Sequence, residues 1–125
     1  MKNIAIIIYS LKGGGAERVV SLLSQELSKK NNLYLIVFDS EDIAYPYGGK
    51  LIDLNIKSNS NVFLKIINVI RRVNSVRKVK KQCNIHCSIS FLDSANIINI
   101  LSKRGDKVII SIHSHLSKGK KDRST

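Results

Sequence analysis

The chain has 125 residues, which suits one small domain or a part of a larger one. Its apolar share of 43% is ordinary, but 21 Lys and Arg residues against 9 Asp and Glu residues give a net charge of +12, which favours polyanionic partners. Two cysteines form no disulfide framework, and no run approaches the roughly 20 apolar residues of a membrane span. We therefore expect a cytoplasmic protein, acting either free in the cytoplasm or on the inner face of the cell membrane.

Apolar periodicity divides the chain into alternating strands and helices. Residues 3–9 read N-I-A-I-I-I-Y, which is typical of a strand buried on both faces. Residues 16–30 then carry apolar side chains at helical spacing. The same pattern predicts further strands at 33–38, 51–54, 85–91 and 107–112, and further helices at 62–82 and 95–103. This alternation predicts an α/β fold, a parallel sheet with helices on both faces and ligands outside the carboxyl ends of its strands.

The turn after the first strand reads Lys12-Gly13-Gly14-Gly15-Ala16-Glu17-Arg18. Glycines permit close backbone approach to a ligand, and the helix that follows offers free N–H groups to an anion. The turn therefore favours a phosphate-bearing ligand, with a simple tight turn as the alternative. The dinucleotide pattern G-x-G-x-x-G would need a glycine where Arg18 stands, and the P-loop pattern is absent. Arg18 is either an anion contact or a solvated surface residue.

The predicted helix 62–82 combines apolar and cationic residues, and Asn61 suits its N-cap. Its apolar stripe contains Phe63, Ile66, Ile67, Ile70 and Val73, and is extended by Val69, Val76 and Val79. The cations that we expect to face an anionic membrane are Arg71, Arg72, Arg77, Lys78, Lys80 and Lys81. The alternative is a helix that packs its stripe on the sheet and leaves a solvated charged face. We expect no nucleic-acid partner, because aromatic residues for base stacking are scarce.

His113 follows the last predicted strand, at the edge where this architecture binds ligands. Its imidazole could hydrogen-bond a substrate or balance a phosphate, and a structural role is the alternative. A zinc site built from Cys83, His86 and Cys87 with His113 and His115 is a further possibility. The spacing of these residues matches no standard zinc finger, so we expect no metal.

Three blocks of sequence, in order, resemble the N-terminal domain of GT-B-fold, family-four glycosyltransferases of bacterial polysaccharide and lipid-linked glycan synthesis. The blocks are I-I-I-Y-S-L-K-G-G-G-A-E-R-V-V-S-L-L-S, I-S-F-L-D-S-A-N-I-I-N-I-L and V-I-I-S-I-H-S. The resemblance spans about residues 2–116 and implies a Rossmann-like, acceptor-side domain over residues 1–116. It implies a sugar transfer from a nucleotide-sugar to a glycan or lipid-linked acceptor, with retention of configuration and without metal or cofactor.

The resemblance also implies roles for single residues. Gly13, Gly14 and Gly15 would approach the donor diphosphate, and His113 would lie near the transferred sugar as the catalytic residue. The acceptor-side residues would be Asp93, Ser94 and Arg18.

Members of this family carry a second domain that holds the donor, and this chain lacks its paired-glutamate motif. Residues 117–125 are polar and basic, and we expect them to be disordered. We therefore expect an N-terminal domain or truncated form of the enzyme, inactive alone because catalysis positions both substrates. A partner chain that supplies a C-terminal domain could complete it. The alternative is a non-catalytic basic α/β module that binds an anionic membrane surface or a phosphorylated ligand.

Overall fold

The computed structural model describes residues 2–56 and 61–111. The elements are β1 (Asn3–Ile8), α1 (Gly15–Leu27), β2 (Asn32–Val37), β3 (Lys50–Asp53), α2 (Val62–Gln82), β4 (Cys87–Phe91), α3 (Asp93–Leu101) and β5 (Lys107–Ser111). Every predicted strand and helix is present, with bounds that differ from prediction by a few residues. Ile112, His113, the predicted domain boundary at 116 and the tail at 117–125 lie outside the described residues.

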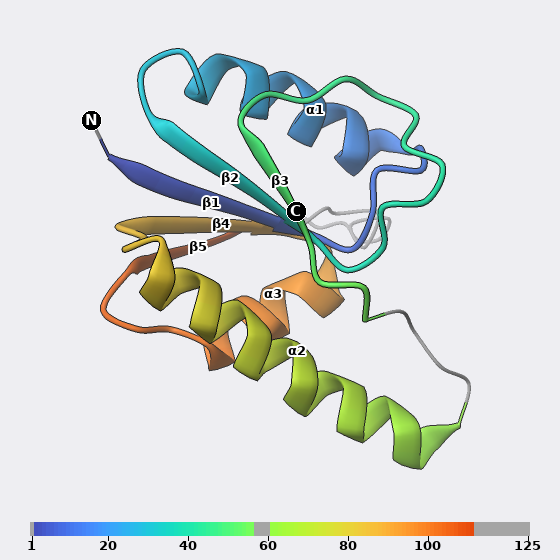
Figure 1. Ribbon diagram of the computed structural model, residues 1–125. Helices are drawn as coiled ribbons and strands as arrows, with labels where there is room; N and C mark the ends of the chain where they lie inside the picture. Colours follow the sequence, from blue (N-terminus) through green and yellow to red (C-terminus); the bar gives the residue numbers. More distant parts are fainter. Residues whose placement is uncertain (1, 57–60, 112–125) are drawn as a thin grey trace, which may run out of the picture.

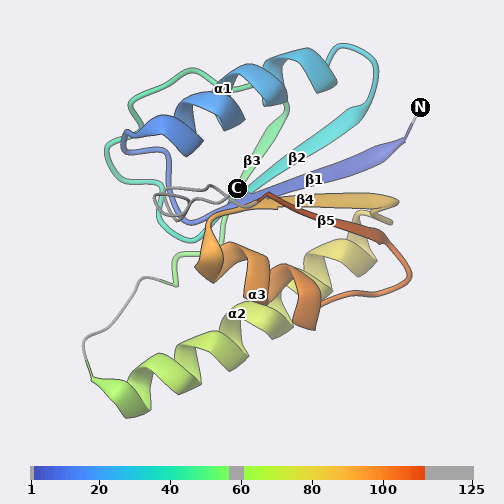
Figure 2. The same cartoon turned by 180° about the vertical axis from the view of Figure 1, so that it is seen from behind.

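The five strands form one parallel sheet in the order β3-β2-β1-β4-β5. Figures 1 and 2 show α1 on one face of this sheet and α2 with α3 on the other. The predicted α/β, Rossmann-like fold is confirmed. The chain runs outward from β1 through β2 to β3, and then α2 returns it past β1 to β4 and β5. The strand order thus reverses between β1 and β4, and such a reversal is where open α/β sheets bind ligands.

The central strand β1 contributes to a hydrophobic core on each face. Ile6 and Ile8 pack in the cluster that contains Val20 of α1. Ala5 and Ile7 pack in the cluster on the other face, which contains Val76 of α2. Because successive side chains of a strand point to opposite faces, a run without polar residues fits only a strand covered on both sides.

The β2–β3 connection contains no helix and lies along α1 (Figure 1). The hydroxyl of Ser21 donates to the carbonyl of Pro46 at 2.5 Å, and the N–H of Gly48 donates to the hydroxyl of Ser24 at 3.0 Å. A Cβ atom at Gly48 would lie 2.6 Å from the carbonyl oxygen of Ser24, so only glycine fits here. These contacts hold the loop on the side of the sheet that carries α1.

Helix α2 packs on the sheet through only part of the predicted stripe. Val73 lies against the core formed by Ala5 and Val76. Phe63 and Ile66, however, are 70% and 57% exposed, because the first half of α2 extends past the sheet (Figures 1 and 2). The alternative interpretation, in which the stripe packs on the sheet, is therefore correct for Val69, Val73, Val76 and Val79 and wrong for Phe63 and Ile66.

Candidate functional site

The turns that follow β1 and β4 lie side by side at the carboxyl edge of the sheet. Ile7 of β1 pairs with Ser90 of β4 in the parallel register, so both strands end at the same level. The first turn carries the three glycines, and the second carries Asp93 and Ser94. The fold thus brings the residues predicted for the donor side and the acceptor side to one edge.

The glycine turn has a backbone that other residues adopt with difficulty. Gly13 has φ +147° and Gly14, the N-cap of α1, has φ +137°. Both glycines and Gly15 are exposed. The carboxylate of Glu17 folds back over the turn, so that a Cβ at Gly14 would lie 2.7 Å from its Oε1 atom. Glu17 therefore sits at the helix start where an incoming anion would approach, and a phosphate would have to displace it.

An ion pair ties the glycine turn to the end of β2. The ammonium of Lys12 lies 3.2 Å from Oδ2 of Asp39, whose side chain is buried while Lys12 is half exposed. The hydrogen bond and charge of Asp39 raise the pKa of Lys12 above its usual 10.5. The backbone N–H of Ala44 also donates to the carbonyl of Leu11 at 2.8 Å. Leu11 and Lys12, which precede the glycines, thus hold the turn in place, while the glycines themselves stay exposed.

The turn after β4 contains a strained residue. Leu92, the N-cap of α3, has φ +76° and ψ +153°, a conformation that costs a non-glycine residue roughly 1–3 kcal/mol. This backbone turns the chain directly from β4 into α3. Asp93 and Ser94 in the first turn of α3 are exposed as a result. Asp93 also complements the positive end of the α3 dipole, which is a structural reason for an acidic residue here.

A cluster of buried polar side chains joins β4, α3 and β5 near the same edge. The hydroxyl of Ser90 donates to Oδ1 of Asn96 at 2.7 Å, and the amide of Asn96 donates to the carbonyl of Ser111 at 3.1 Å. The amide of Asn99 also donates to the hydroxyl of Ser90 at 3.1 Å. The end of β5, two residues before His113, is therefore tied to α3 and β4. This cluster was not predicted, although Ser88 and Ser90, at alternate positions of the buried strand β4, are its signal in the sequence.

Arg72 is not a membrane-facing cation, contrary to prediction. It is 6% exposed, and its Nε and Nη2 atoms donate to the carbonyl of Ile56 at 3.0 and 2.9 Å. Its guanidinium carbon lies 5.4 Å from the ring centre of Tyr9 and 4.9 Å from that of Phe38. Because these three residues follow β3, β1 and β2, Arg72 holds the ends of three strands together. Burial lowers the pKa of Arg72 from its ordinary value.

Lys80 is the second cation whose predicted place is wrong. It is 3% exposed, and its ammonium lies 3.0 Å from Oδ2 of Asp106 and 2.8 Å from Oδ1 of Asn99. Burial raises the pKa of Asp106, but bonds from the N–H of Arg104, the hydroxyl of Ser88 and Lys80 outweigh it and hold the pKa below 3.8. Lys80 therefore joins α2 to α3 and to the turn that precedes β5.

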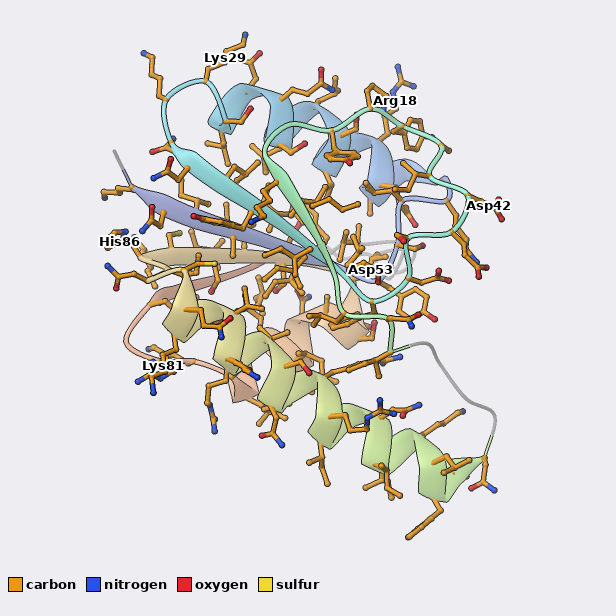
Figure 3. The ribbon with its side chains drawn as sticks, viewed as in Figure 1. Arg18, Lys29, Asp42, Asp53, Lys81 and His86 are labelled. Carbon is orange, nitrogen blue, oxygen red and sulfur yellow. The ribbon has the colours of Figure 1, made fainter. Side chains whose placement is uncertain are left out.

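The other four predicted membrane-facing cations are exposed: Arg71, Arg77, Lys78 and Lys81. Three of them line an open hollow of about 340 Å³ together with Asn74 and Arg104. Arg77 donates from Nη2 to the carbonyl of Leu101 at 2.8 Å, which fixes its guanidinium beside the end of α3. In Figure 3, Lys81 lies at the opposite end of the molecule from Arg18, which projects outward from the first turn of α1. The hollow is thus separate from the glycine turn.

Two further findings concern only residues 2–56 and 61–111. Within them, no group of three or more His, Cys, Asp or Glu side chains is arranged to hold a metal ion. Of the residues weighed as zinc ligands, Cys83 and Cys87 are half-buried free thiols, and Nδ1 of His86 accepts from the N–H of Asn3 at 3.0 Å. No helix in these ranges is long and apolar enough to cross a bilayer.

Comparison with known proteins gives one informative similarity. A curated protein of Campylobacter jejuni is 33% identical to this chain over 119 residues, which cover 92% of this chain and 33% of the relative. It is named GalNAc-alpha-(1->4)-GalNAc-alpha-(1->3)-diNAcBac-PP-undecaprenol alpha-1,4-N-acetyl-D-galactosaminyltransferase. The chain thus spans about a third of the length of this relative. No family model matches the chain.

Proposed function

We propose that this chain is the acceptor-side, N-terminal domain of a GT-B-fold, family-four glycosyltransferase, which moves a sugar from a nucleotide-sugar to a glycan or lipid-linked acceptor. The observation that carries the proposal is the 33% identity to a named N-acetylgalactosaminyltransferase, which extends over 92% of this chain. The fold supports it, since a parallel sheet with a glycine turn at its strand-order reversal suits a phosphate-bearing ligand.

The carboxyl edge of the sheet supplies the proposed roles. The exposed N–H groups of the glycine turn would meet the donor diphosphate once Glu17 swings away, as the geometry at Gly14 requires. Asp93, Ser94 and Arg18 would contact the acceptor, because all three are exposed at the start of helices that begin at this edge. His113, outside the described residues, would act beside the transferred sugar. The Asn96 bond to Ser111 would position the strand that leads to it.

The proposed site needs further residues, on the opposite side of the donor, to bind it. Among the described residues, four isoleucines at the β5 end of the sheet are exposed: Ile97 and Ile100 of α3 at 53% and 51%, and Ile109 and Ile110 of β5 at 40% and 39%. Parallel strands with apolar residues on both faces are normally covered. We propose that further polypeptide, from a longer chain or from a partner chain with a C-terminal domain, completes the enzyme. The domain alone would be inactive.

We place the reaction at the cytoplasmic face of a membrane, because the acceptor in the relative's name contains undecaprenol, a lipid. A complementation experiment tests the activity. This chain would be co-expressed with the part of the Campylobacter relative that lies beyond the matched region, and supplied with UDP-N-acetylgalactosamine and an undecaprenyl-diphosphate glycan. Mass spectrometry of the glycan should show addition of one N-acetylhexosamine. A folded, associated pair that transfers no sugar would count against the proposal.

The same assay tests His113. In an active pair, His113→Ala should lower the transfer rate by about a hundredfold or more, the usual effect of losing a positioned acid–base or hydrogen-bonding group. His115→Ala is the matched control and should keep most of the rate. An unchanged rate in His113→Ala would remove this residue from the catalytic role.

A further inference from the structure

Arg72 connects α2 to the segment of chain that leads into the glycine turn. Its guanidinium carbon lies 5.4 Å from the ring centre of Tyr9, which directly follows β1, and 4.9 Å from that of Phe38, which directly follows β2. The two ring centres are 6.2 Å apart. Two hydrogen bonds to the carbonyl of Ile56, at 3.0 and 2.9 Å, fix the guanidinium in this place. Arg72 therefore holds both rings at the carboxyl edge of the sheet.

The backbone of Tyr9 extends this connection toward the glycines. Its carbonyl accepts the N–H of Phe38 at 2.9 Å and the N–H of Asp39 at 3.1 Å, so the ends of β1 and β2 are joined at this residue. Only three residues separate Tyr9 from Gly13. A displacement of the Tyr9 ring would therefore move the start of the glycine turn and the end of β2 together.

The buried carboxylate of Asp39 makes a second connection to the turn. Its Oδ1 atom accepts the N–H of Glu41 at 2.9 Å, and its Oδ2 atom lies 3.2 Å from the ammonium of Lys12, which directly precedes the glycines. Because a buried charge is stable only with its partners, a displacement of Asp39 would draw Lys12 with it. Both routes from the guanidinium, along the chain after β1 and through the ion pair after β2, thus meet at Lys12.

The glycine turn depends on such support from its flanks. Open space surrounds the positions that a Cβ atom would take at Gly13 and Gly15, so neighbouring atoms do little to hold the turn directly. Glycine also loses more conformational freedom on ordering than any other residue. A turn that is ordered only when a ligand arrives binds that ligand more weakly than a turn that is already in place.

We propose that Arg72 is a positioning residue for the glycine turn and thereby raises the affinity of this turn for the donor diphosphate. The second half of this statement rests on the proposed function, which gives the turn its ligand. Arg72 acts through Tyr9 and Asp39 and does not touch the donor, because its guanidinium is buried between α2 and the strand ends. A residue that only attached α2 to the sheet would affect stability and leave the turn unchanged.

Glycine signals in NMR spectra distinguish these two roles. The chain contains seven glycines, so 15N-labelled glycine gives a spectrum simple enough to follow each amide. In Arg72→Met, the signals of the three glycines of the turn should move or broaden, whereas that of Gly105, between α3 and β5, should stay in place. Arg72→Lys should restore part of the original spectrum, because an ammonium can also face the two rings and donate to the carbonyl of Ile56.

Val79→Ala is the control for stability. Val79 lies two turns further along α2, is 9% exposed and packs in the same core as Val76. Its truncation leaves a cavity and should lower the urea midpoint of unfolding, as Arg72→Met does. It should leave the glycine signals of the turn in place, because Val79 belongs to neither route to Lys12. Equal movement of these signals in Val79→Ala and Arg72→Met, or no movement in Arg72→Met, would overturn the proposal.

The effect on the donor is measured in the active pair of the complementation experiment. Arg72→Met should raise KM for UDP-N-acetylgalactosamine by about tenfold, equivalent to about 1.4 kcal/mol of binding free energy. It should change kcat by less than about threefold, because a poorly positioned turn weakens binding of the donor equally before and during transfer. Arg72→Lys should recover part of the affinity. A fall in kcat with an unchanged KM would contradict the effect on donor affinity.

The two measurements separate this proposal from the proposed function. An unchanged pair that transfers no sugar would count against the transferase activity, while the NMR comparison, which needs neither donor nor acceptor, still decides whether Arg72 positions the turn. Glycine signals that do not respond to Arg72→Met in a chain whose pair is active would overturn the positioning role alone.

Discussion

Single residues at the carboxyl edge adopt conformations that their chemistry explains. Gly14 has a backbone in which a side chain is strained, and the Glu17 carboxylate occupies the space beside it. Arg72 packs against the neighbouring rings of Tyr9 and Phe38 and donates to the carbonyl of Ile56, just after β3. The three consecutive glycines already predicted a turn whose backbone can approach a ligand closely. Nothing in the order of residues singled out Arg72 from Arg71, because only the packed sheet distinguishes two adjacent arginines.

Gly14→Ala should destabilise the fold by about 1–3 kcal/mol, because its φ of +137° disfavours a side chain. The free energy of unfolding in urea measures this. Gly15→Ala is the matched control: nothing lies within 4 Å of a Cβ built there, and it begins α1, so its effect should be neutral or stabilising. Equal effects of the two substitutions would contradict the role given to the φ angle of Gly14.

Arg72→Met should lower the free energy of unfolding by about 2–3 kcal/mol, because it leaves the buried carbonyl of Ile56 without its donor and removes the cation–π contacts. Arg71→Met, one position along the same helix, should change stability by no more than about 0.5 kcal/mol because Arg71 is exposed. Thermal or urea denaturation of the pair checks this. If Arg71→Met proved the more damaging, the packing described for α2 would be wrong.

At the scale of elements, α2 is the informative case. Its bounds of Val62–Gln82 match the predicted range, and Asn61 is the cap, as predicted. Its orientation was predicted less well, since Phe63 and Ile66 face solvent whereas Arg72 and Lys80 are buried. Hydrophobic periodicity assumes that the apolar face packs inward. The assumption fails where a helix extends past the sheet and where buried cations find carbonyl and carboxylate partners.

The Lys80–Asp106 pair predicts a specific effect of charge removal. Asp106→Asn should destabilise the protein by about 3–5 kcal/mol, because it leaves an uncompensated buried ammonium that joins α2 to α3. Replacing both residues, with Lys80→Met and Asp106→Leu, should cost much less, since no buried charge remains. Urea denaturation of the single and double variants measures the difference. A double variant less stable than the single one would contradict this account.

The Lys80–Asp106 pair also predicts part of the pH dependence of the free energy of unfolding. The folded state holds the pKa of Asp106 below the ordinary value of 3.8, so the ionised carboxylate stabilises the fold above that value. This contribution should disappear as the pH falls through the lower, folded pKa. The free energy of unfolding, measured from neutral pH downward, should decline more steeply for the unchanged chain than for Asp106→Asn. Parallel curves would show that Asp106 titrates normally.

At the scale of the whole molecule, β1 is the central strand of the sheet, and β3 and β5 are its two edges. The strand-order reversal places the glycine turn beside Asp93 and Ser94, while α3 and β5 expose isoleucines toward solvent. An apolar edge strand of this kind invites pairing with other chains. The distribution of exposed surface thus agrees with the proposal that further polypeptide completes the protein.

The isolated chain should therefore self-associate in a concentration-dependent way. Ile110→Lys should weaken that association roughly tenfold or more, because it places a charge on the open edge. Val19→Lys, which alters a 45% exposed residue on α1, should leave it unchanged. Light scattering coupled to size-exclusion chromatography gives the mass of the unchanged chain and of both variants. Association that responds to Val19→Lys instead would locate the contact on α1.

The sequence by itself determined the elements, their parallel arrangement and the glycine turn. Strand runs such as Ile4–Ile8 and the cap at Asn61 act through local periodicity and short-range hydrogen bonds, which the order of residues contains. Only the tertiary structure decided that Arg72 and Lys80 are buried while Phe63 is exposed. The reason is that the partners of the two buried cations are distant in sequence: Arg72 bonds to Ile56, 16 positions earlier, and Lys80 pairs with Asp106, 26 positions later. Burial of a charge depends on such distant partners and on where the sheet ends, and the residues adjacent in sequence specify neither.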